Sequence, residues 1–433
     1  MTVAVIELND ADVRLSRDGK LLARQPGYAQ INAGGLLLGE AAREQARIHP
    51  LQTNNQFWHQ LNLDDIASPN PKVRHHGDLA HLQLDQLCEG QSLADVVFAV
   101  PGSFTGAQLS LLLGIAHQSP FTTVGMVDSA VAIAAQCAPP GQFTVLDMQL
   151  HQTVVTRVEV GDTVVRRDVD SVANAGLLAC YERLATLVAD QFIRFTRFNP
   201  RHDAATEQTL FNQLPDWLTH CRTDSDYEFE LEGKSVQLSR NLLLECVAPV
   251  YELLRRRVQS AGDGILMNPA AGSLPGLAES WPATHSVDTT AVATACHQLL
   301  PHIRQAAAGI SFATELPATR APVTLQRHRA GDRATHLLHR HRAYPLSRGT
   351  LYVGGGEQPV VGPRLSADSR YAIAAAAGQW HLQLIDGYTP LVNDKPGTEG
   401  AVLQVGDTLR SARDETAMTV ISVLPDSGYL NGG

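Results

Sequence analysis

The chain has 433 residues, 44% of them hydrophobic, and this length is too great for one compact core, so we expect two or three domains. The formal net charge is −10, and no run among the 34 Lys and Arg residues has the density of a nucleic-acid footprint. No stretch reaches about 18 consecutive apolar residues, and the N-terminus enters a predicted strand directly, so we expect neither a membrane span nor a secretory leader. The six cysteines lie far apart without a CxxC pair, which is typical of a reduced, cytoplasmic protein, and no Cys/His spacing predicts a metal site.

The N-terminal segment predicts a strand, a turn and two further strands. Thr2–Leu8 is a near-continuous apolar run, which favours a buried central strand. Asn9 and Asp10 form the turn, and Val13–Leu15 begins the returning strand. Asp18-Gly19 is a hairpin signal that leads into Lys20–Ala23. Glu7 therefore stands at the end of the first strand, next to a polar turn.

The next segment alternates predicted helices and strands. Glu40–Ile48 is rich in Ala and Glu and predicts a helix, which ends at His49-Pro50. The pattern then predicts, in order, strand Leu93–Pro101, helix Phe104–His117, strand Thr122–Met126 and helix Asp128–Cys137. Such alternation is typical of a doubly wound α/β architecture.

A second hairpin, in Gly141–Val160, contains the most informative turn of the chain. Its strands are Phe143–Leu146 and Thr153–Val158, and Asp147 follows the first of them. Met148, Gln149, Leu150 and His151 fill the turn. Phosphate-binding turns of this kind use consecutive glycines, because any Cβ blocks the close approach of phosphate to backbone N–H groups. Side chains therefore fill this turn at the places where a phosphate-binding turn would have glycines.

The remainder of this region predicts helices around a small hairpin. The segments are helix Val172–Phe195, strands Tyr227–Leu231 and Ser235–Leu238, helix Leu238–Gln259, the strand and small-residue turn of Gly264–Leu277, and helix Val287–Ile303.

This order of elements resembles the nucleotide-binding domain of the DnaK-type seventy-kilodalton heat-shock chaperones. The segments VVFAVPGSFTGAQ and VDSAVAIAA resemble two of its stretches, and further matches in order are Gly39, Ala42, Gln45, Ala46, Pro50 and Thr53. The resemblance implies an α/β fold of the actin-like two-lobed ATPase type, with ribonuclease H-like halves, over residues 1–312. Lobe I is then expected at 1–170 and lobe II at 171–312.

The resemblance also implies positions for a nucleotide site. Glu7, Asp128 and Asp147 would stand around a metal ion and its waters. The nucleotide loops would lie at Asn9, Asp10, Gln149, His151, Asn268, Gly272 and Ser273. An alternative interpretation makes Asp128 the N-cap of its helix and the other two acids inherited turn residues.

Several parts of that site are replaced in this chain. The turn after Glu7 is Leu8-Asn9-Asp10 instead of glycine and threonine, and Phe57–Asp65 contains no catalytic Lys. Asn268-Pro269 replaces the glycine pair of the adenosine loop. Because phosphates require backbone donors and a cation, the pattern argues against ATP hydrolysis.

The C-terminal third predicts a separate domain. Residues 313–348 form a predicted His/Arg-rich linker, residues 349–424 predict a small all-β sandwich, and 425–433 form a tail. Val392-Asn393 and Gly406–Leu409 resemble forkhead-associated domains, which bind phosphothreonine. The phosphopeptide-like positions are Arg370 and Asn393, although a surface arginine is the favoured interpretation of Arg370.

We therefore expect a chaperone-like pseudo-ATPase that acts as a protein-interaction scaffold or regulator, with protein partners, without a resident cofactor and without nucleic acid or membrane. One alternative is a weak ATPase that takes ATP and Mg²⁺, and ATP hydrolysis is the only reaction that the sequence suggests. Another alternative is a phosphopeptide-binding module in the C-terminal domain.

Overall fold

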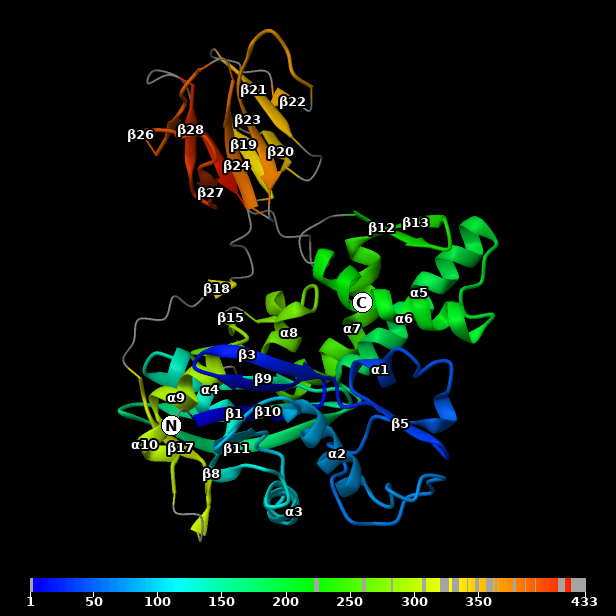
Figure 1. The fold of residues 1–433 in the computed structure, drawn as a ribbon. Coiled ribbons are helices and arrows are strands. Elements are labelled where there is room, and N and C mark those ends of the chain that lie inside the picture. Colours follow the sequence, from blue (N-terminus) through cyan, green and yellow to red (C-terminus); the bar gives the residue numbers. More distant parts are fainter. Residues whose placement is uncertain are drawn as a thin grey trace, which may run out of the picture. The chain divides into compact units, whose positions relative to one another are not determined.

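A computed structural model describes most of the chain, in the ranges 3–221, 226–258, 262–281, 283–305, 309–319, 327–328, 335–340, 342–346, 350–355, 361–362, 364–376, 379–385, 387–393, 395–411 and 417–421. The described residues up to 328 form one compact unit, and those from 335 to 421 form a second (Figure 1). The first unit is mixed α/β, and the second is built from strands.

The first unit contains a six-stranded sheet with the order β16-β8-β7-β1-β2-β3. The central strand β1 pairs with β2 in antiparallel and with β7 in parallel orientation. The strands are β1 (Val3–Glu7), β2 (Val13–Arg17), β3 (Lys20–Gln25), β7 (Asp95–Val100), β8 (Thr122–Asp128) and β16 (Phe312–Ala313). A small three-stranded sheet is made of β4 (Ala29–Asn32), β5 (Gly35–Leu38) and β6 (Thr53–Asn54).

A seven-stranded sheet with the order β17-β11-β10-β9-β14-β15-β18 forms the other half of this unit. Its central strand β9 pairs with β10 in antiparallel and with β14 in parallel orientation. The strands are β9 (Gly141–Met148), β10 (Gln152–Val160), β11 (Thr163–Ala173), β14 (Gly264–Met267), β15 (Thr284–Ser286), β17 (Glu315–Pro317) and β18 (Arg327–His328), and a separate hairpin joins β12 (Asp226–Leu231) to β13 (Lys234–Ser239).

The two sheets repeat one arrangement of five strands. The order β3-β2-β1-β7-β8 in the first sheet matches β11-β10-β9-β14-β15 in the second, with the same sequence of antiparallel and parallel pairings. Helix α4 (Ser129–Cys137) follows β8, and α9 (Ala291–Gln298) follows β15. Apolar residues of both helices pack with residues of both sheets in one buried cluster. The β1–β2 turn and the β9–β10 turn therefore occupy equivalent positions in the two halves.

The remaining helices surround these sheets. They are α1 (Glu40–Arg43), α2 (His76–Cys88), α3 (Gly106–Ala116), α5 (Leu177–Thr196), α6 (Ala204–His220), α7 (Arg240–Arg257), α8 (Pro269–Ser273) and α10 (Leu300–Ile303), with short 3₁₀ turns at Pro50–Gln52 and Ala278–Ser280. Helices α5, α6 and α7 share a core with the β12–β13 hairpin, where Trp217 meets Phe229 edge to face at 4.5 Å between ring centroids. None of the described helices is long and apolar enough to cross a membrane.

Several sequence predictions differ from this structure, and the predicted helix Glu40–Ile48 is an α-helix only over Glu40–Arg43. The predicted helix Val172–Phe195 begins only at Leu177, because β11 occupies Thr163–Ala173. Strand β11 carries several charged residues and is largely exposed, so its sequence shows no clear alternation of apolar and polar residues. Its pairing with β10 is what makes it a strand. The seven-stranded sheet begins at Gly141, whereas the predicted boundary between the lobes is at residue 170. Helices α2 and α6 were not predicted.

The second unit is a pair of sheets with a shared core, which confirms the predicted strand-rich C-terminal region. The sheets have the orders β20-β19-β29-β28-β25-β26 and β22-β21-β23-β24-β27, and Leu337, Tyr371 and Leu382 are among the buried residues between them. The strands are β19 (His336–His339), β20 (Arg342–Pro345), β21 (Leu351–Gly354), β22 (Val361–Gly362), β23 (Ser369–Ala376), β24 (Gln379–Leu384), β25 (Leu391–Val392), β26 (Lys395–Pro396), β27 (Val402–Leu403), β28 (Thr408–Arg410) and β29 (Met418–Ile421).

The predicted linker at 313–348 is not a plain connection. Strands β17 and β18 pair with strands of the second sheet, and β19 and β20 already belong to the C-terminal sandwich. Backbone pairing therefore orders parts of a segment whose His- and Arg-rich composition suggested a solvated linker. The predicted tail at 425–433 lies outside the described residues.

Two glycines test the packing of the first half. A Cβ on Gly125 in β8 would lie 2.5 Å from the carbonyl oxygen of Ile303, so we expect Gly125→Ala to destabilise the fold by about 1–3 kcal/mol. Gly114 in α3 has open space around it, so Gly114→Ala should be neutral or stabilise by up to about 1 kcal/mol. Urea unfolding of both variants measures the difference, and equal midpoints would contradict this packing.

Candidate functional site

The equivalent turns of the two halves hydrogen-bond directly to each other. The backbone N–H of Leu150, in the β9–β10 turn, donates to Oδ1 of Asp10, in the β1–β2 turn, at 2.7 Å. Nδ2 of Asn9 donates to the carbonyl oxygen of Met148 at 2.9 Å. A backbone N–H has one hydrogen, so the Leu150 donor already has its acceptor. The turns are thus closed on each other by groups of the protein.

Helix α5 fixes the β9–β10 turn from its other side. The first N–H groups of a helix lack partners within the helix and attract anions. Here the N–H groups of Leu177 and Leu178 donate to the carbonyl oxygens of Gln149 and Leu150 at 2.9 and 3.0 Å. The start of α5 therefore binds the filled turn.

Three side-chain amides surround the carboxylate of Asp147, and we call them the amide cluster: Asn9, Gln149 and Asn268. Nδ2 of Asn9 and Nδ2 of Asn268 donate to Oδ1 at 2.9 and 2.8 Å. Nε2 of Gln149 donates to Oδ2 at 3.3 Å. Oδ1 of Asn268 also caps α8 by accepting from the N–H of Ala271 at 3.0 Å. The amide cluster thus links both turns to the start of helix α8.

Burial controls the ionisation of the carboxyl groups near these turns. Asp147 and Asp10 are 6% and 4% exposed. Burial raises the pKa of Asp147 to about 6, against the opposing effect of the amide cluster. Burial likewise raises the pKa of Asp10 to about 7 and that of Glu7 to about 7. Oδ2 of Asp10 is buried without a hydrogen-bond partner in the described part of the chain.

The other two members of the predicted acidic trio point to separate partners. Oδ2 of Asp128 accepts from Nη1 of Arg166 at 2.8 Å, and its Oδ1 accepts from the N–H of Ala130 at 2.8 Å. Asp128 is therefore the N-cap of α4, as the alternative interpretation proposed. Glu7 lies 3.8 Å from Nη1 of Arg14. Among the described residues, no group of three or more His, Cys, Asp or Glu side chains gathers as a metal site would require.

The remaining predicted loop residues are held by local contacts. Nε2 of His151 donates to the carbonyl oxygen of Asn55 at 2.9 Å. Gly272 and Ser273 lie in the short helix α8, and the hydroxyl of Ser273 donates to the carbonyl oxygen of Ala270 at 2.7 Å. The structure therefore unites Asn9, Gln149 and Asn268 around Asp147, and leaves these three outside the cluster.

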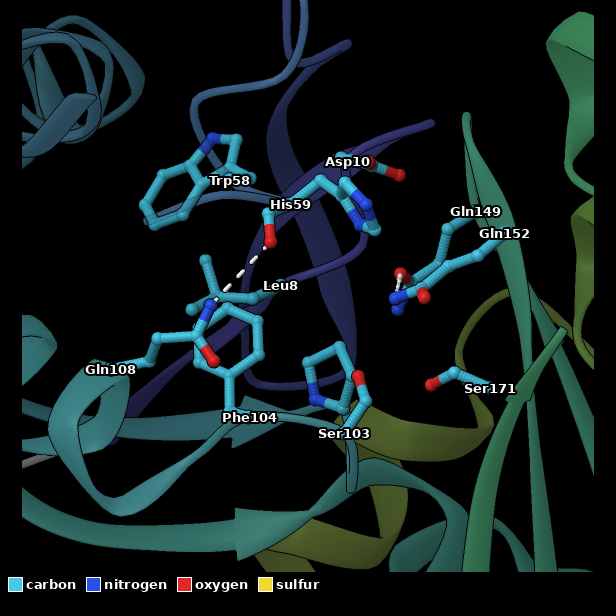
Figure 2. A pocket seen from close by; sticks show the side chains of 11 residues that line it. Leu8, Asp10, Trp58, His59, Ser103, Phe104, Gln108, Gln149, Gln152 and Ser171 are labelled. Carbon is cyan, nitrogen blue, oxygen red and sulfur yellow. Dashed lines mark hydrogen bonds between the residues drawn. The ribbon is translucent and has the colours of Figure 1, made fainter. Parts of the chain in front are cut away.

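A cavity of about 210 Å³ remains beside the turns (Figure 2). Asp10 and Gln149 line it, as two of the predicted positions. Sequence reasoning did not assign the other polar or aromatic lining residues Trp58, His59, Ser103, Phe104, Gln108, Gln152 and Ser171. They come from separate loops, from strands β10 and β11 and from helix α3, and the only signal in the sequence was the missing Lys near Trp58 and His59.

The two phosphopeptide-like positions predicted in the second unit, Arg370 and Asn393, contact neighbouring residues of their own unit. The guanidinium of Arg370 lies over the ring of Tyr388 at 4.9 Å from its centroid. Oδ1 of Asn393 accepts from the N–H of Thr408 at 2.9 Å, and its Nδ2 donates to Oδ1 of Asp407 at 2.8 Å. Asn393 therefore stabilises its own turn, and phosphopeptide binding stays a prediction.

Comparison of the chain with known protein families and with curated proteins gives no matching family model and no matching protein.

The structural role of Asp128 can be measured with two adjacent arginines. Asp128 has a fully buried side chain, so Arg166→Ala leaves its carboxylate without a charge partner, and we expect a loss of about 1–3 kcal/mol. Arg167 pairs with Glu159 on the surface, so Arg167→Ala should change stability by less than about 1 kcal/mol. Chemical denaturation measures the free energy of unfolding of both variants. An Arg166→Ala variant as stable as the wild type would contradict a structural role for the Asp128–Arg166 pair.

The raised carboxyl pKa values predict that stability falls as pH rises. A raised pKa in the folded state means that the native protein binds the proton more tightly than the unfolded chain does. The resulting stability is full below the ordinary carboxyl pKa near 4 and is lost as pH rises through about 6 to 7. We expect Asp147→Asn to remove part of this slope, at about 1.4 kcal/mol per pKa unit.

Urea unfolding between about pH 5 and pH 8 measures that slope. The exposed Asp64 supplies the control, because Asp64→Asn should keep the wild-type slope. An unchanged slope in Asp147→Asn would contradict a buried, proton-binding carboxyl at this position.

Proposed function

We propose that the first unit is an actin-like fold, related to the DnaK-type chaperone ATPases, whose nucleotide site is occupied by its own side chains. The repeated five-strand order supports this, because it gives two halves with helices α4 and α9 in equivalent places. In open α/β sheets, ligands bind beyond the carboxyl ends of the strands. The β1–β2 and β9–β10 turns stand at such ends in both halves.

The single observation that carries the proposal is the hydrogen bond from Leu150 N–H to Asp10. A phosphate between the two turns would need their backbone N–H groups as donors and would need space for its oxygens. The 2.7 Å distance between Leu150 N and Asp10 Oδ1 leaves no room for an inserted phosphate oxygen. Binding of a triphosphate would require this contact to break and a buried carboxylate to move.

The charge of the site points the same way. Phosphoryl transfer needs cations to offset the phosphate charge. Among the described residues, no Lys or Arg lines the cavity, whereas Asp10 does, and Asp10 lies within electrostatic range of Asp147. An anion entering here would meet carboxyl groups, so electrostatics disfavours a nucleotide.

A fold without its nucleotide serves best as a rigid platform for other proteins. We propose that the protein acts as an interaction scaffold or regulator, with partner contacts on both the actin-like unit and the strand-built unit. The second unit supports this role, because its resemblance to forkhead-associated domains is a resemblance to protein-binding modules.

The proposal predicts that Mg-ATP leaves the melting temperature unchanged. A ligand at a hundredfold excess over its Kd adds about 2.7 kcal/mol to stability, which thermal melting detects easily. We therefore expect the same transition with and without millimolar Mg-ATP, with Mg²⁺ alone as the control for metal effects. A saturable rise with Mg-ATP, together with phosphate release, would show an active nucleotide site and defeat the proposal.

A further inference from the structure

We propose that the cavity beside the two turns binds a small neutral polyhydroxylated molecule, of the size of a single sugar ring. The inference rests on the proposed function, because it assumes that phosphate is excluded from the site. It assigns a ligand class to the space that the filled turns leave open.

The size of the cavity sets the first limit. Its volume is about 210 Å³. Pockets for drug-sized ligands usually measure about 300–1,000 Å³. The cavity therefore suits a single small ring or a short polyol, and not a nucleoside triphosphate.

The walls combine flat apolar surface with polar groups on opposite sides. Figure 2 shows Trp58 and Phe104 on one side of the cavity, and Gln149, Gln152 and Ser171 facing them. The indole of Trp58 is fixed, since its Nε1 donates to Oε1 of Gln83 at 2.6 Å. Aromatic rings pack against the C–H faces of small rings, and amides and hydroxyls bond to hydroxyl groups. This combination matches a molecule with an apolar face and a polar edge.

Several polar groups in the cavity have hydrogen-bonding capacity left. The hydroxyls of Ser103 and Ser171 make no hydrogen bond to another residue of the described chain. Nε2 of Gln152 donates to Oε1 of Gln149 at 3.0 Å, and within the described chain the side-chain oxygen Oε1 of Gln152 accepts no hydrogen bond. The Nδ1 of His59 is buried without a partner among the described residues. These groups offer both donors and acceptors, as a hydroxyl-rich ligand requires.

The unpartnered serine, glutamine and histidine groups are neutral, so they suit a polyol better than an ion. Burial, together with the neighbouring His151, lowers the pKa of His59, so its imidazole is uncharged at neutral pH. Asp10 is the one carboxyl group among the described lining residues. Its Oδ1 accepts from the N–H of Leu150, and its Oδ2, like Nδ1 of His59, is buried without a partner in the described part of the chain. Among the described lining residues, an anion therefore finds no cationic side chain, and a cation finds a single carboxyl group with one oxygen already bonded.

The test is a titration of the full chain with myo-inositol, D-ribose, D-glucose and glycerol, followed by ligand-observed NMR and by thermal melting. Concentrations stay in the millimolar range, because molar polyols stabilise proteins without binding. At least one probe should bind saturably, whereas inorganic phosphate and Mg-ATP should not.

Two variants locate the binding. Ser103→Phe fills the cavity and should abolish saturation, and Gln152→Leu removes one hydrogen-bonding group and should weaken binding by about tenfold. Ser92→Phe, on an exposed serine outside the cavity, should bind like the wild type. Circular dichroism shows whether each variant is folded. If Ser103→Phe does not fold, the binding measured with Gln152→Leu still tests the inference.

The outcomes separate this inference from the proposed function. Absence of saturable binding by all four probes, or wild-type binding by both cavity variants, overturns the inference and leaves the proposed function intact. Saturable binding of inorganic phosphate or Mg-ATP overturns both.

Discussion

The direct hydrogen bond between the two hairpin turns is the constraint on which the site depends. Asp10 and Leu150 come from equivalent places in the two halves of the first unit and lie 140 positions apart in the chain. Their contact fixes the distance between the two sheets at the level of the turns. Because the N–H of Leu150 and the carboxylate of Asp10 bind each other, neither is presented to a ligand, and the space beside them is reduced to a small cavity.

The amide cluster makes this closed arrangement tolerable energetically. A buried carboxylate costs free energy unless donors surround it. Asn9, Gln149 and Asn268 supply those donors to Asp147, and Asn268 at the same time begins helix α8. Burial still raises the pKa values of Asp147 and Asp10, so the closed site favours the protonated form of both acids. Residues that resemble catalytic acids thus contribute to the cohesion of the two halves, and the cavity that remains has neutral free groups.

Much of the architecture follows from local sequence pattern. The apolar runs gave β1, β7, β8 and β9 nearly at their observed bounds, since buried parallel strands are continuous in hydrophobicity. The prediction failed for β11 and for helices α2 and α6, where charge or weak periodicity hides the element until it pairs or packs. In the site, the absence of glycine at Gln149–His151 was visible in the sequence, whereas the loss of a phosphate-binding turn stays a prediction. The partners of those side chains could not be predicted, because Asn9, Asp147 and Asn268 meet only when the two halves assemble.

The sequence by itself determined the α/β character of the first unit, the strand-rich C-terminal region and the absence of glycine from both turns. These properties depend on residue type and short-range periodicity, which each segment carries alone. Only the tertiary structure decided that Asp128 pairs with Arg166, that Asp10 binds the opposite turn, and that a cavity survives beside Trp58 and Gln152. Those outcomes depend on distances between segments far apart in the chain, and packing of the whole unit sets these distances.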